Sequence, residues 1–300
     1  MKKCKLCCVG HITHDKVITP KASVHMSGGT AFYFGNALRG CKDVDFVLVT
    51  AVGEPDVPVV EEMREQGMDV VLLPSKHSVY FENIYGADPN KRTQRVLAKA
   101  DPFSVEGMQG IKAEIYHLGS LLADDFSLEV IKYLSTQGLV SVDSQGFLRE
   151  VRGTDVFAVD WAEKREMLRH IHFLKMNEDE AEVLTGTSDL REAAKILYDW
   201  GVKEPIITLG SFGSVVYDGE SFYRIPAYIP DSEIMDVTGC GDTYMAGYLY
   251  RRSEGDSIEE CGKFAAAMST IKIKSMGCFH GTEQDVYNTI ETAQSCLPEI

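Results

Sequence analysis

The chain has 300 residues, of which 44% are hydrophobic and 25% are charged, and its formal net charge is −15 at pH 7. This composition is typical of a globular protein and excludes a largely disordered chain. Nucleic-acid-binding proteins usually carry a basic surface, so the acidic balance argues against DNA, RNA and anionic membranes as partners. A nucleotide ligand is not excluded, because backbone N–H groups at a helix N-terminus can bind phosphate.

The apolar runs and the cysteines predict a cytoplasmic protein. No apolar run reaches the roughly 18–20 residues of a membrane span. The apolar stretch 6–9 is shorter than the core of about 7–15 residues in a secretory signal peptide. The eight cysteines then need no disulfides. Cys4 and Cys7 have the spacing of half a zinc site, but no second pair follows, which favours ordinary thiols.

The first quarter of the chain alternates between strand and helix patterns. Short apolar runs bounded by turn residues predict strands, and apolar residues three or four apart predict helices. In chain order, these patterns predict strands at 5–10, 16–20 and 22–26, a helix at 30–39, a strand at 44–50, a helix at 57–66 and a strand at 70–73.

Residues 77–100 interrupt this alternation. Two strand-like stretches, 79–85 and 93–98, flank the turn-rich segment 86–90, which predicts a β-ribbon. This ribbon can pair with the strands in 13–26 to form a small β-lid. Its open edge can also pair with a second subunit, so the sequence allows a monomer or a homodimer through the lid.

The alternation resumes after this ribbon. Strands that alternate with helices predict an α/β fold with a mainly parallel sheet and helices on both faces. Ligands of such sheets bind beyond the carboxyl ends of the strands. Because no linker divides the chain, we expect one domain over residues 1–300. The remaining predicted elements are strands at 115–118, 139–142, 173–175, 205–209, 214–217 and 221–225, and helices at 127–136, 178–184, 189–199, 242–252, 257–273 and 283–293.

The segment 236–243 (DVTGCGDT) stands directly before a predicted helix. Gly239 and Gly241 let the backbone turn tightly, and the N–H groups that open the helix would form an anion hole. Asp242 lies within this hole. Taken alone, Asp242 could serve only as an N-cap, for which Asp is a preferred residue. The chain contains neither a P-loop nor a G-x-G-x-x-G motif.

Several motifs together resemble the PfkB carbohydrate kinase family, of the ribokinase type. The pattern D-x-x-G-x-G-D-x-x-x-x-G from Asp236 to Gly247 resembles the family's second signature, and Gly28-Gly29 before a helix resembles the first. The other matches follow the family's order across nearly the whole chain. They are residues 10–15 (GHITHD) for the substrate entry, 177–180 (NEDE) for the N-x-x-E motif and 208–213 for the nucleotide segment.

The resemblance implies a ribokinase-like doubly wound fold and an ATP-dependent phosphotransferase. Asp242 would take the proton from a substrate hydroxyl, a general-base effect typically worth about 10²–10⁴ in rate. The backbone N–H groups of Gly239, Cys240 and Gly241 would stabilise charge on the transferred phosphoryl group. Cys240 stands where the family usually has Ala, and its position at a helix N-terminus predicts a lowered thiol pKa.

The resemblance also implies the sites for ATP and Mg²⁺. Asn177 and Glu180 would hold Mg²⁺ and its waters, although Glu180 could also be an ordinary solvated helix carboxylate. Some relatives use K⁺, and the sequence leaves a K⁺ requirement open. The residues expected to bind the nucleotide are Asn177, Glu180, Thr208, Gly210, Gly213 and Gly277.

The substrate is expected to be a small polyol. Asp15 would accept hydrogen bonds from its hydroxyls, and Gly28 and Gly29 would let a sugar-like ring approach closely. The stretches 82–89 and 143–149, followed by Asp160-Trp161, resemble the bacterial myo-inositol kinase-like branch of the family. A cyclitol with six hydroxyls would suit a site formed by Asp15, Asn83, Asp143 and Gln145.

Two other functions stay open. One is a nucleoside or ketohexose kinase with the same fold. The other is a non-catalytic sugar or nucleotide sensor. Asp242, Gly241 and Glu180 favour an enzyme, because a sensor does not need a base inside an anion hole.

Overall fold

The computed structural model describes residues 3–18, 22–85 and 92–300. Within these ranges the largest sheet has nine strands, in the order β15-β14-β13-β12-β9-β8-β1-β4-β5. From β13 to β5 all neighbouring strands pair in parallel, and β14 and β15 are antiparallel. The strands are β1 (Cys4–Gly10), β4 (Phe46–Val52), β5 (Val70–Pro74), β8 (Ala113–Gly119), β9 (Leu139–Asp143), β12 (Phe173–Asn177), β13 (Glu204–Thr208), β14 (Ser214–Tyr217) and β15 (Phe222–Ile225).

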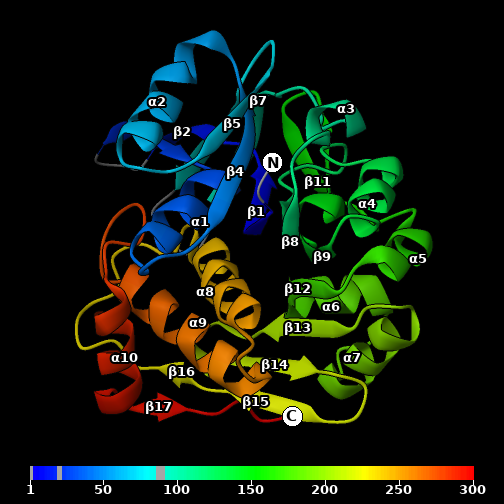
Figure 1. Cartoon of the computed structure of the whole chain (residues 1–300), viewed down its shortest axis with the longest axis vertical. Coiled ribbons are helices and arrows are strands. Elements are labelled where there is room, and N and C mark those ends of the chain that lie inside the picture. Colours follow the sequence, from blue (N-terminus) through cyan, green and yellow to red (C-terminus); the bar gives the residue numbers. More distant parts are fainter. Residues whose placement is uncertain (1–2, 19–21, 86–91) are drawn as a thin grey trace.

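Helices cover both faces of this sheet (Figure 1). In β1, Leu6 and Cys8 belong to one core and Cys7 and Val9 to the other. Successive strand residues point to opposite faces, so a strand buried on both sides is apolar throughout. One core contains residues of α1 (Thr30–Arg39), α2 (Val57–Glu65), α8 (Cys240–Glu254), α9 (Ile258–Lys272) and α10 (Glu283–Thr292). The other contains residues of α3 (Val105–Met108), α4 (Leu128–Ser135), α5 (Lys164–Met167), α6 (Glu178–Thr185) and α7 (Leu190–Asp199).

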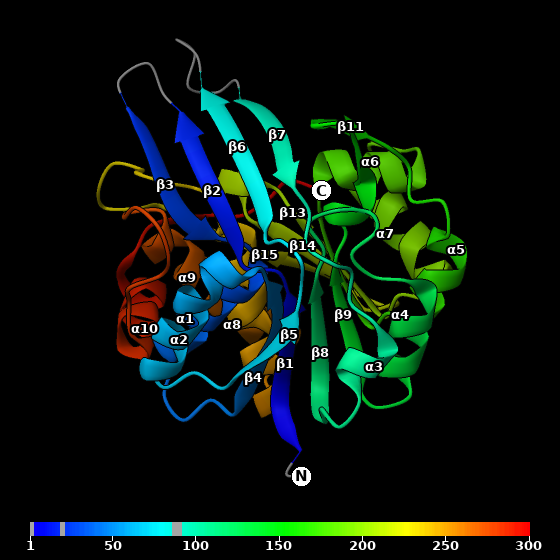
Figure 2. The same cartoon turned by 90° about the horizontal axis from the view of Figure 1, so that it is seen from above.

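A second sheet, which we call the lid sheet, has six strands within the described ranges, in the order β10-β11-β7-β6-β2-β3. The expected pairing between the two inserted regions is present, because β2 runs parallel to β6. Figure 2 shows β2, β3, β6 and β7 extending together past the end of the central sheet. The strands are β2 (Thr13–Ile18), β3 (Ser23–Gly28), β6 (Val79–Tyr85), β7 (Arg92–Ala98), β10 (Arg149–Arg152) and β11 (Asp155–Ala158).

The predicted fold class is confirmed: the chain has a mainly parallel sheet, helices on both faces and a small β-lid. Several details differ from the sequence prediction, and the short helices α3 and α5 are among the elements that it missed. The strands expected at 16–20 and 22–26 form with shifted bounds, as β2 (Thr13–Ile18) and β3 (Ser23–Gly28). The β10–β11 hairpin was missed. A short pair, β16 (Ala227–Tyr228) with β17 (Ser295–Cys296), was also missed. The turn predicted at 86–90 lies outside the described residues.

The topology brings the ends of several elements to one edge of the main sheet. β9 and β12 end there at Asp143 and Asn177, and α8 begins after Gly239. Gly29, which precedes α1, has φ 85°, and an added Cβ would lie 2.2 Å from the carbonyl oxygen of His11. A residue with a side chain therefore does not fit at position 29, where the chain entering β2 passes the start of α1. In the part of the chain that the structure describes, no helix combines the length and apolarity needed to cross a bilayer.

Candidate active site

The start of α8 forms the glycine turn that the sequence predicts, which we call the α8 turn. Gly239 is the N-cap, with φ 74°, and an added Cβ would lie 2.3 Å from the ring of Tyr33. The Cys240 N–H group donates to the carbonyl of Val237 at 3.2 Å. Among the described residues, the N–H groups of Gly239 and Gly241 have no protein acceptor. These two groups are therefore available as donors for an anion, whereas the N–H of Cys240 is already engaged.

Asp242 lies in the first turn of α8 and is half-buried. The interpretation of Asp242 as an N-cap is wrong, because the N-cap is Gly239. Burial, and then the charge of Asp143, raise the pKa of Asp242 to about 6. A hydrogen bond from Thr30 and the charge of Lys175 oppose this rise. The result is a carboxylate with a proton affinity near that of an efficient general base at neutral pH.

Lys175 is the main site residue that the sequence analysis missed. It belongs to β12, is only 7% exposed, and its Nζ lies 3.0 Å from Oδ2 of Asp143. A Cβ added to Gly241 would lie 3.0 Å from the same Nζ, so the ammonium is next to the α8 turn. Burial opposes its charge, but Asp143, Glu180 and Asp242 outweigh burial and raise the Lys175 pKa. The side chain is therefore a permanent cation.

A cavity of about 260 Å³, which we call the lid cavity, lies between the lid sheet and the start of α8. Its predicted lining residues are Asp15, Gly29, Asn83, Asp143, Gln145, Gly239, Cys240, Gly241 and Asp242. Its unpredicted lining residues include Thr30, Tyr33, Gln94, Arg149 and Lys175.

Hydrogen bonds fix two of the polar groups in the lid cavity. Oδ1 of Asp143 accepts from the backbone N–H of Gln145 at 3.1 Å, and Oδ1 of Asn83 accepts from Nε2 of Gln94 at 3.0 Å. Gly28 does not line the lid cavity. A Cβ there would lie 2.5 Å from Oδ2 of Asp15, so Gly28 makes room for this carboxylate.

A second cavity of about 680 Å³, which we call the apolar cavity, lies on the other side of the α8 turn. Four of the residues expected from the sequence to bind the nucleotide line it, namely Asn177, Thr208, Gly210 and Gly213. Its apolar wall was not predicted and consists of Ala227, Tyr228, Ile229, Pro230, Ile234, Tyr244, Ala266 and Ile273.

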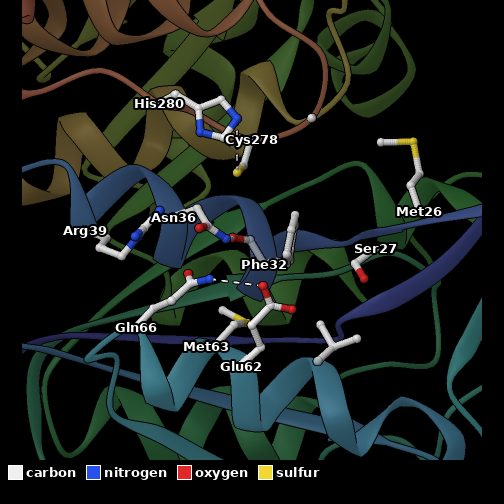
Figure 3. A pocket seen from close by; sticks show the side chains of 12 residues that line it. Met26, Ser27, Phe32, Asn36, Arg39, Glu62, Met63, Gln66, Cys278 and His280 are labelled. Carbon is white, nitrogen blue, oxygen red and sulfur yellow. Dashed lines mark hydrogen bonds between the residues drawn. The ribbon is translucent and has the colours of Figure 1, made fainter.

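Gly277 is not among the residues that line the apolar cavity. It lines a separate cavity between α1, α2 and the loop after α9, with Arg39 and His280 (Figure 3). Its N–H group donates to Oδ2 of Asp236 at 3.1 Å. Through this bond, Gly277 holds the segment before α8.

Asn177 and Glu180 form a capping box at the start of α6. Oδ1 of Asn177 accepts from the Glu180 N–H at 2.7 Å, and Oε2 of Glu180 accepts from the Asn177 N–H at 2.9 Å. Burial, and then Asp143, raise the pKa of Glu180 against the opposing charge of Lys175. Glu180 lines neither cavity, and no cluster of three or more His, Cys, Asp or Glu residues in the described ranges could hold a metal by itself.

The two cavities meet at the α8 turn, because Lys175, Val237, Cys240 and Gly241 line both of them. A ligand in each cavity would therefore approach the other beside Lys175. The expected low pKa of Cys240 is wrong: burial raises the pKa of this thiol, against a hydrogen bond from Ser269 and nearby lysines.

The lid cavity and the apolar cavity meet at a helix N-terminus, beside a mainly parallel sheet. This is the arrangement of a small-molecule kinase. The chain belongs to the pfkB family of carbohydrate kinases, whose model matches residues 112–285, more than half of its length. The family predicted from the motifs is therefore confirmed.

Individual relatives have different substrates. A cytidine kinase from Thermococcus kodakarensis is 29% identical over 282 residues, covering 90% of this chain and 96% of the relative. A nucleoside kinase from Methanocaldococcus jannaschii is 27% identical over 291 residues, covering 91% of this chain and 92% of the relative. A solved pyrophosphate-dependent kinase in the ribokinase family, complexed with a pyrophosphate analogue and myo-inositol, has a TM-score of 0.82 and 29% identity, covering 94% of this chain and 99% of the other.

Proposed function

We propose that this kinase transfers the γ-phosphoryl group of ATP to a hydroxyl of a small polyol, with Asp242 as the catalytic base. The junction of the two cavities at the first turn of α8 is the main support for this proposal. A polyol in the lid cavity and a triphosphate in the apolar cavity would have their reacting groups next to each other. Asp242 lines the lid cavity, on the polyol side of the junction.

In the proposed reaction, Asp242 accepts the proton of the attacking hydroxyl while the new O–P bond forms and ADP leaves. Lys175 and the N–H groups of Gly239 and Gly241 would stabilise the charge on the transferred phosphoryl group. One well-placed donor of this kind contributes about 3–4 kcal/mol to transition-state stabilisation. These groups need little reorganisation, because Lys175 is held by Asp143 and the turn by α8.

The apolar cavity favours a nucleoside triphosphate over pyrophosphate as the donor. Ile229 and Ile234 on its wall are 52% and 58% exposed. A nucleotide base can bury such residues, whereas pyrophosphate has no apolar part to do so. Because the solved relative is pyrophosphate-dependent, the donor needs a direct test.

Mg²⁺ would be held near the β12–α6 turn by Glu180 and Asn177. The donor set fits, because Oε1 of Glu180 makes no hydrogen bond with the described residues and a carboxylate oxygen is a ligand that Mg²⁺ prefers. Mg²⁺ usually keeps several waters and takes one or two protein carboxylates. When bound, it would neutralise part of the phosphate charge.

Myo-inositol is the acceptor that we propose first. Asp15, Asn83, Asp143 and Gln145 supply acceptors and donors around the lid cavity, which suits a ligand with many hydroxyls. Its volume of about 260 Å³ is below the roughly 300–1,000 Å³ of pockets for drug-sized ligands. The lid sheet would close over the polyol and exclude water, which would otherwise take the phosphoryl group.

A nucleoside or ketohexose is the second candidate acceptor, and the names of the two relatives above favour a nucleoside. A sensor without catalysis has no observation in its favour. We also infer a cytoplasmic location, because all eight cysteines are free thiols, which a reducing compartment preserves.

A phosphorylation assay tests both substrates. Myo-inositol, fructose, ribose, adenosine and cytidine are each offered with ATP and with pyrophosphate, and the highest kcat/KM is expected for myo-inositol with ATP. Asp242→Asn should lower kcat about 10²–10⁴-fold. Asp199→Asn, an exposed change at the end of α7, is the control and should retain wild-type activity. Preference for a nucleoside would exclude the polyol, and preference for pyrophosphate would exclude ATP as the donor.

A further inference from the structure

Lys272 has an unusual environment for a lysine. It is the last residue of α9, and its side chain is fully buried. Its Nζ donates to the backbone carbonyl oxygen of Asp236 at 2.7 Å and lies 3.2 Å from Oδ2 of the same residue. A buried ammonium is costly unless it is paired and hydrogen-bonded. Both of these partners belong to Asp236, which begins the segment leading into α8.

Asp236 organises this segment. Its Oδ1 accepts from the N–H of Thr238 at 2.9 Å, and its Oδ2 accepts from the N–H of Gly277. Burial works to raise the Asp236 pKa, but the hydrogen bonds and Lys272 outweigh it and hold the pKa below its usual value. Asp236 is therefore a carboxylate that joins the loop after α9 to the turn at Gly239.

The position that Nζ of Lys272 occupies would otherwise suit a small cation. A carboxylate oxygen and a backbone carbonyl oxygen of one residue face the same buried point, and oxygen atoms of these kinds are ligands of hard cations. The Lys272 ammonium fills that point. The residues present therefore do not fit a K⁺ ion that would order this segment.

We propose that Lys272 is a positioning residue that serves as a covalently attached cation. Its ammonium holds Asp236 and thereby fixes the turn that carries Gly239, Gly241 and Asp242. Phosphoryl transfer by this chain then needs no monovalent metal ion. The proposal rests on the proposed function in one respect: the α8 turn must be where the phosphoryl group is bound.

The first test uses the unaltered protein. Its kcat is measured with an acceptor that it phosphorylates, in chloride salts of K⁺, Na⁺ and tetramethylammonium at equal ionic strength. We expect the same kcat in all three salts. Activation by K⁺ of more than about fivefold would overturn the proposal. A fivefold effect is the lower end of typical coupling between binding sites. Turnover in tetramethylammonium also establishes the kinase reaction itself, so failure of the proposed function is recognised separately.

The second test removes the ammonium. Lys272→Met keeps most of the apolar stem without the charge, and it should lower kcat about 10²-fold, as displacement of a catalytic turn by about 1 Å can do. The KM for the acceptor should be unchanged. Lys274→Met is the matched control, because its side chain is 30% exposed and pairs with the exposed Asp231. Full activity in Lys272→Met would overturn the proposal.

The third test separates positioning from a general loss of packing. Lys272→Ala leaves space for a small cation, so NH₄⁺ or methylammonium should restore part of its lost kcat, while tetramethylammonium should not. A folded Lys272→Ala protein, judged by circular dichroism, that gains nothing from these ions contradicts the proposal. If this variant does not fold, the kcat of the unaltered protein in the three salts and the kcat of Lys272→Met still test the proposal.

Discussion

Asp242 and Asp143 line the lid cavity from different elements, α8 and β9. Burial and the charge of Asp143 raise the Asp242 pKa to about 6. A general base must be ionised, so activity should rise with pH through this pKa. We predict that kcat/KM falls about tenfold per pH unit below 6 and is level above it. Measurement between pH 4.5 and 8.5 tests this prediction, and a flat profile between pH 5 and 7 contradicts it.

A variant at Lys175 identifies the group behind this profile. The Lys175 charge lowers the Asp242 pKa, so Lys175→Met should move the acidic limb to higher pH as well as reduce kcat. Lys132→Met removes an exposed lysine that pairs with Glu166 and should leave the limb in place. An acidic limb that does not move in Lys175→Met would mean that another group controls the profile.

Motifs identified some residues of the site and missed others for a physical reason. Asp242 and Asn177 stand in fixed patterns, at the start of a helix and at the end of a strand, where sequence spacing determines position. Lys175 stands inside an apolar strand, and its role depends on Asp143, 32 residues away in sequence. A lysine within an apolar run was itself a signal, because lysine is almost never fully buried without a partner.

At the scale of whole elements, α8 is fixed at its far end as well as at the α8 turn. Glu204, 4% exposed at the start of β13, pairs with Arg252 and accepts from the Tyr248 hydroxyl at 2.8 Å. We predict that Glu204→Gln lowers the free energy of unfolding by about 2 kcal/mol, because a charged hydrogen bond is lost and Arg252 is left half-buried and unpaired. Urea denaturation measures this difference.

The control for this prediction is a surface ion pair. Glu166→Gln breaks the pair with Lys132, where both side chains are about half exposed, and should lower the free energy of unfolding far less than Glu204→Gln, because solvent screens an exposed ion pair. Because Asp242 lies at the opposite end of α8, kcat of Glu204→Gln should stay near the wild-type value. Equal losses of stability in the two variants would contradict the anchoring role of Glu204.

The elements whose bounds were predicted well are those in which a single apolar pattern marks the buried residues. β6 and β14 match their predicted bounds, and α1 does too, because apolar periodicity and a following Gly or turn define their ends. The β10–β11 hairpin was missed, since half of its strand residues are charged and all of them are at least partly exposed. It joins the lid sheet through backbone pairing with β7, which side-chain periodicity does not report.

At the scale of the whole molecule, charge should affect the two substrates differently. The net charge is −15, and the exposed Glu178 and Asp179 line the apolar cavity. Long-range repulsion of this kind slows the approach of an anion and is screened by salt over about 10 Å at 0.1 M. A neutral polyol is not subject to it.

We therefore predict that raising the ionic strength from about 20 to about 200 mM increases kcat/KM for ATP about threefold and leaves kcat/KM for a neutral polyol unchanged. Initial rates with each substrate varied in turn, at constant Mg²⁺ and pH, give both values. Glu178→Gln/Asp179→Asn should weaken the salt effect on ATP, whereas Glu259→Gln, an exposed change on α9, should not. If kcat/KM for ATP instead falls with salt, local attraction by Lys175 outweighs the field of the whole chain.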